Sequence, residues 1–236
     1  MRALGLVLAG LLVACQGTIS ARERGKQLLG DPGLSDSPAN VFACEDCHEI
    51  EVGGAGSRVL PGYSLVDSAF RDGYWGGYER TLIEAMSYCR ITFMRGVAFE
   101  EEADDARAIL EYLLSVSTTD PAPQLPLTVT LDIVEVERGD PARGAEVYER
   151  ACAHCHGDAG ARPPEAFRED VTAIPDDEAG WADLYDEDFP DTPFGLIVTE
   201  KVRHGRFFLV GGVMPLFSQE ALSDADLGAL LAHMEI

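Results

Sequence analysis

Two copies of one short motif have residue types and a spacing that could do chemistry in this chain of 236 residues. The motif is Cys-x-x-Cys-His, and it occurs at residues 44–48 and 152–156. Two thiols at this spacing can bond to the edge of a porphyrin, and the histidine that follows can place its imidazole on the iron. A zinc site or a redox dithiol does not need a histidine directly after the second cysteine. The motifs therefore predict two covalently bound haem c groups, held by the cysteines Cys44, Cys47, Cys152 and Cys155 and by the proximal histidines His48 and His156.

The N-terminal residues have the pattern of an export signal. Met1 and Arg2 precede an apolar run over residues 3–13, which is too short to span a bilayer. The tetrapeptide Leu-Val-Ala-Cys that ends at Cys15 resembles the lipobox of bacterial lipoproteins, whose cysteine is lipidated and becomes the first residue of the mature chain. The resemblance implies a signal peptide over residues 1–14, a lipidated tether over 15–22, and an exported, membrane-anchored protein that faces the periplasm. An ordinary secretory signal with an incidental cysteine is the alternative.

The charge balance limits the partners. The chain has 18 Lys and Arg against 41 Asp and Glu, which gives a formal net charge of -23. Such an acidic protein is not expected to bind nucleic acid or anionic lipid headgroups by electrostatics. The charge favours redox proteins with a basic docking patch as partners, and the lipid anchor would bring the chain to the membrane.

The same order of elements occurs twice: a helix, the cysteine motif, a long loop with a later methionine, and a closing helix. Apolar spacing predicts helices over residues 21–29, 78–88 and 103–115, and again over 141–151, 192–203 and 223–234. Residues 120–126 are rich in proline, and residues 127–136 alternate like an edge strand or a segment laid over a domain. We therefore expect domains over residues 23–118 and 138–236, joined by a linker over 119–137. Such a semi-rigid linker would keep the two haems at a fairly constant separation.

Both copies resemble class I cytochrome c domains, the small all-helical fold that wraps one haem. The resemblance covers nearly the whole chain after the export signal. It implies an all-α protein of two tandem class I cytochrome c domains, each around one covalent haem.

Cytochromes c of this type present a methionine to the iron from the loop before the last helix. Met214 has this place in the second copy, after two glycines and before Pro215. A thioether opposite a histidine favours ferrous iron and raises the reduction potential, which suits an electron carrier. Met214 is therefore predicted as the distal ligand of haem 2.

Two sulfur atoms compete for the distal position of haem 1. Alignment of the two closing helices places Met94 close to the register of Met214, which favours Met94. The pattern Cys-x-x-x-x-Met-x-Gly that begins at Cys89 instead resembles thiosulfate dehydrogenases and sulfur-oxidising dihaem cytochromes, where the cysteine binds iron. Cys89 is also the one cysteine of six with no other predicted role. Both ligands remain open, and a thiolate would make haem 1 the low-potential centre.

One-electron transfer between redox partners is the function that these patterns favour, as a carrier or an electron-transfer subunit without catalytic residues of its own. The alternative is a thiosulfate dehydrogenase-like sulfur oxidoreductase. Those enzymes carry an arginine four residues before the cysteine, where this chain has Ala85, so that anion binding would depend on Arg80, Arg90 or Arg95. A third reading is a dihaem cytochrome c peroxidase, because residues 28–35 are similar to the opening of that family. No distal acid–base residue can be placed for it by spacing.

Overall fold

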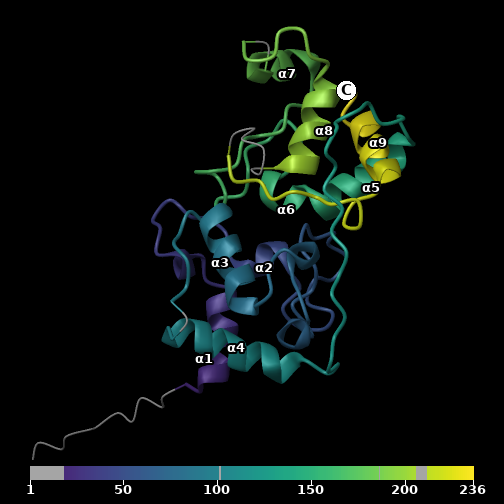
Figure 1. Ribbon diagram of the computed structural model, residues 1–236. Helices are drawn as coiled ribbons and strands as arrows, with labels where there is room; N and C mark the ends of the chain where they lie inside the picture. Colours follow the sequence, from purple (N-terminus) through teal and green to yellow (C-terminus); the bar gives the residue numbers. More distant parts are fainter. Residues whose placement is uncertain (1–18, 101, 186, 206–211) are drawn as a thin grey trace, which may run out of the picture.

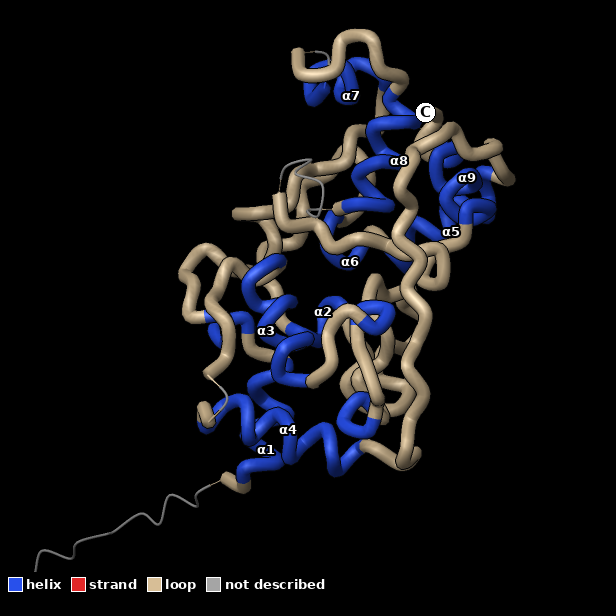
Figure 2. Tube along the Cα trace, in the orientation of Figure 1, coloured by secondary structure: helices blue, strands red, loops and turns tan. Residues whose placement is uncertain are grey.

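The computed structural model describes residues 19–100, 102–185, 187–205 and 212–236 (Figure 1). These residues form helices joined by long loops, and no strand occurs among them (Figure 2). The first domain contains α1 (Ala21–Leu29), α2 (Cys44–Cys47), α3 (Leu82–Thr92) and α4 (Asp104–Val116), and the second contains α5 (Pro141–Ala151), α6 (Ala153–His156), α7 (Glu178–Tyr185), α8 (Phe194–His204) and α9 (Asp224–His233). The predicted all-α fold is confirmed. None of the helices in these ranges has the length and apolar character needed to cross a membrane.

The first domain is built on a close crossing of its first and last helices, α1 and α4. Gly25 of α1 permits the crossing, because a Cβ at this position would lie 2.0 Å from the carbonyl oxygen of Ala108 in α4. The apolar stripe of α4 faces inward there, and Ile109 and Leu113 are both 0% exposed. The burial of this stripe against α1 forms part of the core of the first domain.

Helix α3 begins at Leu82, four residues later than apolar spacing predicted. The reason is a capping box at Thr81, whose hydroxyl accepts a hydrogen bond from the backbone N–H of Glu84 (3.3 Å). The Glu84 carboxylate in turn accepts one from the backbone N–H of Thr81 (3.0 Å). Residues 78–80 therefore belong to the loop that leads into the helix, and α3 extends further toward Cys89 and Thr92.

The second domain repeats the crossing with α5 and α9. A Cβ on Gly144 of α5 would lie 2.0 Å from the carbonyl oxygen of Ala229 in α9. The start of α5 combines an Asp140 side-chain cap with a proline at the first helical position. The Ser223 hydroxyl caps α9 as predicted, accepting from the backbone N–H of Asp226 (3.1 Å). Local capping and a glycine contact thus produce the same helix pair in both halves.

The linker over residues 119–137 runs along the side of the molecule from α4 to α5 (Figure 1). Residues 127–136 form no strand, and of the two predicted alternatives they follow the segment laid over a domain. Thr128 donates to the Glu220 carboxylate through its backbone N–H (3.0 Å) and its hydroxyl (2.5 Å). The hydroxyl of Tyr63 donates to the carbonyl of Pro126 (2.7 Å). The linker is therefore tied to both domains.

The two domains also contact each other directly. Phe42 of the first domain forms a small apolar core with Phe167 and Val213 of the second, and each is at most 5% exposed. Beside this core, Nη1 of Arg95 lies 2.7 Å from Oδ1 of Asp170, whose side chain is 9% exposed. An apolar core and an ion pair therefore fix one domain against the other.

Candidate haem centres

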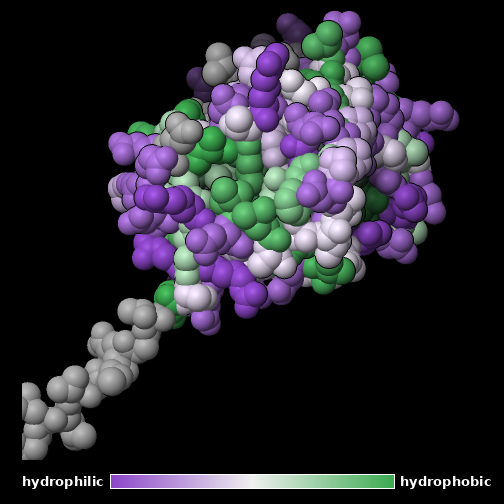
Figure 3. Space-filling view, turned by 60° about the horizontal axis from the view of Figure 1, so that its bottom comes forward, coloured by the Kyte–Doolittle hydropathy of each residue, from purple (hydrophilic) through white to green (hydrophobic). Residues whose placement is uncertain are grey.

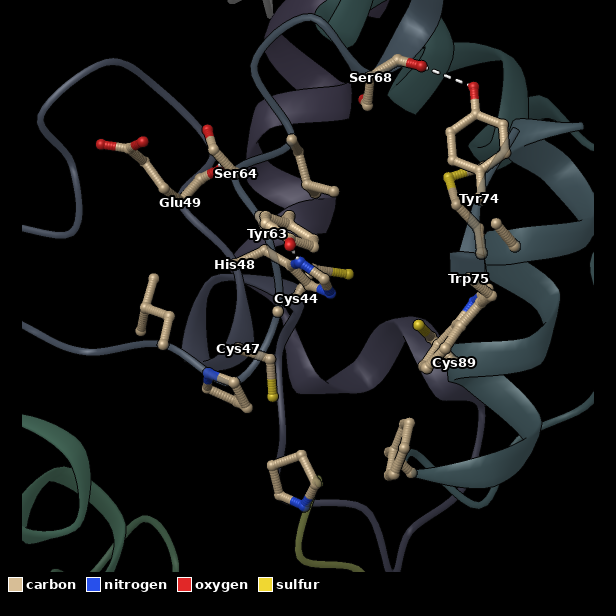
Figure 4. A pocket seen from close by; sticks show the side chains of 18 of the residues that line it. Cys44, Cys47, His48, Glu49, Tyr63, Ser64, Ser68, Tyr74, Trp75 and Cys89 are labelled. Carbon is tan, nitrogen blue, oxygen red and sulfur yellow. Dashed lines mark hydrogen bonds between the residues drawn. The ribbon is translucent and has the colours of Figure 1, made fainter. Parts of the chain in front are cut away.

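A large cavity lies in the first domain between the loop that carries α2 and the wall formed by α3 (Figure 4). Its volume is about 480 Å³, and most of its lining side chains are apolar. Figure 3 shows hydrophobic side chains gathered around a hollow on one face of the molecule. A porphyrin is a flat, largely apolar group, so a cavity of this character suits it. The lining includes every residue predicted to attach or ligate haem 1: Cys44, Cys47, His48, Cys89 and Met94.

His48 is oriented for metal binding by its neighbours. Its Nδ1 lies 2.7 Å from the carbonyl oxygen of Tyr63. Burial, partly offset by this hydrogen bond, lowers the pKa of His48 below its usual value. A neutral ring that donates from Nδ1 leaves the lone pair of Nε2 available to iron. His48 therefore fits the predicted role of proximal ligand.

The cysteines are also in a state that suits covalent attachment. Five cysteines lie in the described ranges, and none of them forms a disulfide. Burial, together with the nearby Asp46, raises the pKa of the Cys44 thiol to about 12. Cys44 and Cys47 are thus protonated thiols at the edge of an apolar cavity. Cys15, the predicted lipidation site, lies outside the described residues.

The two candidate sulfur ligands of haem 1 lie in different surroundings. Cys89 points into the cavity from α3, on the wall opposite His48 (Figure 4). Burial raises the pKa of its thiol to about 12, so a thiolate there requires a compensating cation. Met94 also lines the cavity, but it is 5% exposed and packs in the core cluster with Leu34 and Ile109. The cavity thus has a thiol that faces His48 and a thioether that belongs to its packed wall.

Two of the arginines considered as anion anchors are used by the fold. Arg90 is 6% exposed and donates to the carbonyl of Leu34 (2.9 Å) and to Asp36 (2.5 Å). Its guanidinium also lies over the ring of Phe99, 4.5 Å from the centroid. Arg95 is held by Asp170. Neither side chain is therefore a freely solvated helix end.

The second motif orients its histidine in the same way as the first. Nδ1 of His156 lies 2.9 Å from the carbonyl oxygen of Thr172, and burial lowers the pKa of the ring. Met214 is half-buried beside the core of the second domain. Gly211, part of the predicted ligand loop, lies outside the described residues. His204 is buried and hydrogen-bonded to Glu200 and to the carbonyl of Thr130, which occupies both of its ring nitrogens.

Lys201 was missed by sequence reasoning. It is half-buried on α8, and its charge contributes to the lowered pKa of His156, which places it near the second centre. Burial lowers the pKa of Lys201 itself. The sequence does contain a sign that Lys201 is unusual, because it is one of two lysines in the chain and lies within the apolar pattern of α8.

Comparison with known proteins agrees with this geometry. Residues 139–234 match the family model described as cytochrome C oxidase, cbb3-type, subunit III. This part of the chain is therefore similar to cytochrome c subunits of that type. A relative from Azospirillum sp. (strain B510), the Cbb3-type cytochrome c oxidase subunit CcoP, is 27% identical over 225 residues, which cover 90% of this chain and 64% of that protein. The chain thus spans less than two thirds of the length of this relative.

A solved structure with some likeness is the thiosulfate dehydrogenase TsdBA from Marichromatium purpuratum in its as-isolated form. The identity is 14% and the TM-score 0.42, over 91% of this chain and 45% of that one.

The two Cys-x-x-Cys-His motifs meet at the contact between the domains. Asp46 is the residue before Cys47, and His154 is the residue before Cys155. Oδ1 of Asp46 lies 2.9 Å from Nε2 of His154. Arg58 also holds Asp46 in position, because its guanidinium donates to the backbone carbonyl of Asp46 (2.7 Å). Spacing alone could not reveal this pair, because its members are separated by 108 positions in sequence.

Proposed function

We propose that this chain is a dihaem cytochrome c that passes single electrons between redox proteins. The observation that carries the proposal is the hydrogen bond between Asp46 and His154, since it brings the two attachment motifs face to face. Haems attached at these motifs would be held by the residues on the two sides of this contact. An electron accepted at one centre would then reach the other without leaving the chain.

The chain's own residues supply the conditions for this reaction. Bound haem supplies a one-electron couple. Burial keeps His48 and His156 neutral, and the carbonyls of Tyr63 and Thr172 orient their rings. We assign Cys89 as the distal ligand of haem 1, because it faces His48 across the cavity, and Met214 as that of haem 2. The apolar cavity walls exclude water, which limits the reorganisation that accompanies a change of charge.

We further propose that the chain acts as an electron-transfer subunit of a cbb3-type oxidase complex. The similarity to the Azospirillum oxidase subunit and the family match over residues 139–234 support this assignment. Attachment to the membrane through a lipidated Cys15 would place the haems on the periplasmic side, next to such a complex. Replacement of Cys15 by serine should release the protein from the membrane fraction without loss of haem. Continued membrane association of that variant would contradict the lipid anchor.

A direct test of electron transfer uses protein matured in a host that attaches haem c. Intact mass should show two haem additions, and the reduced protein should be oxidised rapidly when a cbb3-type oxidase and oxygen are added together. Oxygen alone is the control. The proposal fails if the mass shows fewer than two haems, or if the oxidase leaves the rate of haem oxidation unchanged.

A sulfur-compound oxidoreductase is the second candidate, and the position of Cys89 opposite His48 favours it. The fold engages Arg90 and Arg95, so that of the three anion anchors considered only the exposed Arg80 is left for it. Thiosulfate added to the oxidised protein distinguishes the two functions. Rapid reduction of the haem bands would support the enzyme, whereas an unchanged spectrum supports the carrier. Peroxide added to the reduced protein tests the peroxidase reading in the same way.

A further inference from the structure

The segment that carries Met214, the proposed distal ligand of haem 2, lies where the two domains face each other. It belongs to the chain between α8 and α9 and runs along the side of the second domain nearest the first (Figure 1). Val213 is 2% exposed and Leu216 is 4% exposed, whereas Met214 and Pro215 between them are half-buried. Two buried side chains therefore anchor the ligand segment, one on each side of Met214.

The first anchor, Val213, packs against the first domain. It shares the small apolar core between the domains with Phe42 of the first domain and Phe167 of the second. The ring centroids of Phe42 and Phe167 are 5.8 Å apart. Cys155, predicted to attach haem 2, packs at the edge of the same core. One aromatic side chain of the first domain thus supports both the residue before Met214 and an attachment position of haem 2.

The second anchor borders the cavity predicted to hold haem 1. Pro215 and Leu216 belong to the second domain, yet both line this cavity of the first domain. Haem bound there would occupy the space that these two residues border. The residues after Met214 therefore depend on the first centre, as the residue before it depends on Phe42.

The second domain holds the backbone of the same segment. The backbone N–H of Phe217 donates to the carbonyl of Val202 (2.8 Å), and Nη1 of Arg203 donates to the carbonyl of Phe217 (3.0 Å). Gly205 lies under Met214, because a Cβ there would be 2.5 Å from the Met214 carbonyl oxygen. Backbone contacts within the second domain and side-chain packing on the first domain thus act together on Met214.

We propose that the first domain positions the distal ligand of the second haem. Phe42 acts through Val213, and haem 1 acts on Leu216, so that Met214 is held ready for the iron of haem 2. The inference rests on the proposed function, since it takes haem at both motifs and Met214 as a ligand. The reverse dependence is not expected, because His48 and both candidate sulfur ligands of haem 1 belong to the first domain.

Imidazole competes with a methionine for ferric haem iron, so its apparent affinity measures how firmly Met214 is held. The titration uses the oxidised two-haem protein and follows the far-red charge-transfer band of methionine-ligated ferric haem. The part of this band that is absent from Met214→Ala belongs to haem 2. Phe42→Ala should raise the apparent affinity of haem 2 for imidazole about tenfold, which corresponds to about 1.4 kcal/mol and is within the range of coupling between side chains that share a packed core.

Phe99→Ala is the matched control. Phe99 also lines the first cavity, but it packs against the core cluster of the first domain that contains Met94. This variant should leave the imidazole affinity of haem 2 at its wild-type value. The potential of haem 2 should follow the same pattern, with a decrease in Phe42→Ala and none in Phe99→Ala, because a weaker thioether bond favours ferrous iron less.

Two further kinds of variant keep the test decisive. If Phe42→Ala does not yield two-haem protein, Phe42→Leu should change the imidazole affinity in the same direction by a smaller factor. The double variant Cys44→Ala, Cys47→Ala, which retains haem 2 alone, should also hold Met214 more weakly. The converse double variant Cys152→Ala, Cys155→Ala should leave the ligand spectrum of haem 1 unchanged.

The outcomes separate this inference from the proposed function. An imidazole affinity in the Phe42 variants no higher than that in Phe99→Ala, in protein whose mass shows two haems, overturns the inference alone. A far-red band that is unchanged in Met214→Ala overturns the ligand assignment of the proposed function. Wild-type protein with fewer than two haems overturns both.

Discussion

Gly62 lies directly against the imidazole of His48. Its backbone N–H donates to the carbonyl of Cys47 (3.0 Å), and a Cβ at this position would lie 2.2 Å from Cε1 of the ring. The neighbouring Tyr63 provides the carbonyl that is hydrogen-bonded to Nδ1 of His48. The segment after the motif thus sets both the position and the tautomer of the predicted ligand.

Replacement of Gly62 by alanine should therefore displace His48 and disturb haem 1 selectively. We expect two attached haems by mass, because the cysteines are unchanged, but a loss of the low-spin spectrum of one of them. Gly30→Ala is the control, since a Cβ there meets only the flexible side chain of Glu45, at 3.1 Å. Identical haem spectra for the two variants would show that the contact does not position His48.

The sulfur ligand of haem 1 can be assigned with two variants. Cys89→Ala should remove the low-spin thiolate signal and raise the potential of haem 1, because the anionic sulfur stabilises ferric iron. Met94→Leu should keep that signal and cost less than about 1.5 kcal/mol of stability, as a volume-conserving change in the core cluster that contains Met94. Electron paramagnetic resonance of the oxidised protein distinguishes the outcomes. A low-spin haem 1 spectrum that is the same in Cys89→Ala as in the wild type, and that is lost in Met94→Leu, would instead assign Met94 as the ligand.

The features of this fold that could be predicted from the sequence are local ones. The motifs at Cys44 and Cys152 and the cap of α9 at Ser223 are encoded within a few residues. The start of α3 was misplaced because apolar spacing outweighed the capping box at Thr81, which was present in the sequence. Helix α7, within the long loop of the second domain, was not predicted, since its residues have little amphipathic pattern.

The features that could not be predicted from the sequence depend on contacts between residues that are far apart in the chain. Asp46 and His154 carry no sign of their pairing, because each is only a variable position of its own motif. Arg90 and Arg95 were considered as anchors for an anion, whereas tertiary contacts with Asp36 and Asp170 give both of them structural partners. The identity of such partners is set by how the domains pack, which no local pattern specifies.

The ion pair between Arg95 and Asp170 predicts a cost for separating the domains. Arg95→Ala would leave the nearly buried Asp170 carboxylate without its cation, and we expect a loss of about 1–3 kcal/mol, reduced by the 33% exposure of the Arg95 side chain. Denaturant unfolding of the holoprotein measures this loss. The double variant Arg95→Ala, Asp170→Ala should recover part of it, because no unpaired charge remains. Additive losses in the double variant would argue against a direct interaction.

Glu220 predicts a pH dependence for the contact between the linker and the second domain. Burial alone would raise the pKa of its carboxyl group, but hydrogen bonds from the hydroxyl and backbone N–H of Thr128 outweigh this and lower it from 4.5 to about 2. A carboxyl group with a lowered pKa binds protons more weakly in the folded state, so its contribution is fully present above pH 4.5 and is lost as the pH falls toward 2. The stability difference between the wild type and Glu220→Gln should therefore be constant from about pH 5.5 to 8 and shrink below pH 4.5. Thr128→Val, which removes the hydroxyl donor, should reduce this pH dependence. A difference that grows on acidification would contradict the assigned hydrogen bonds.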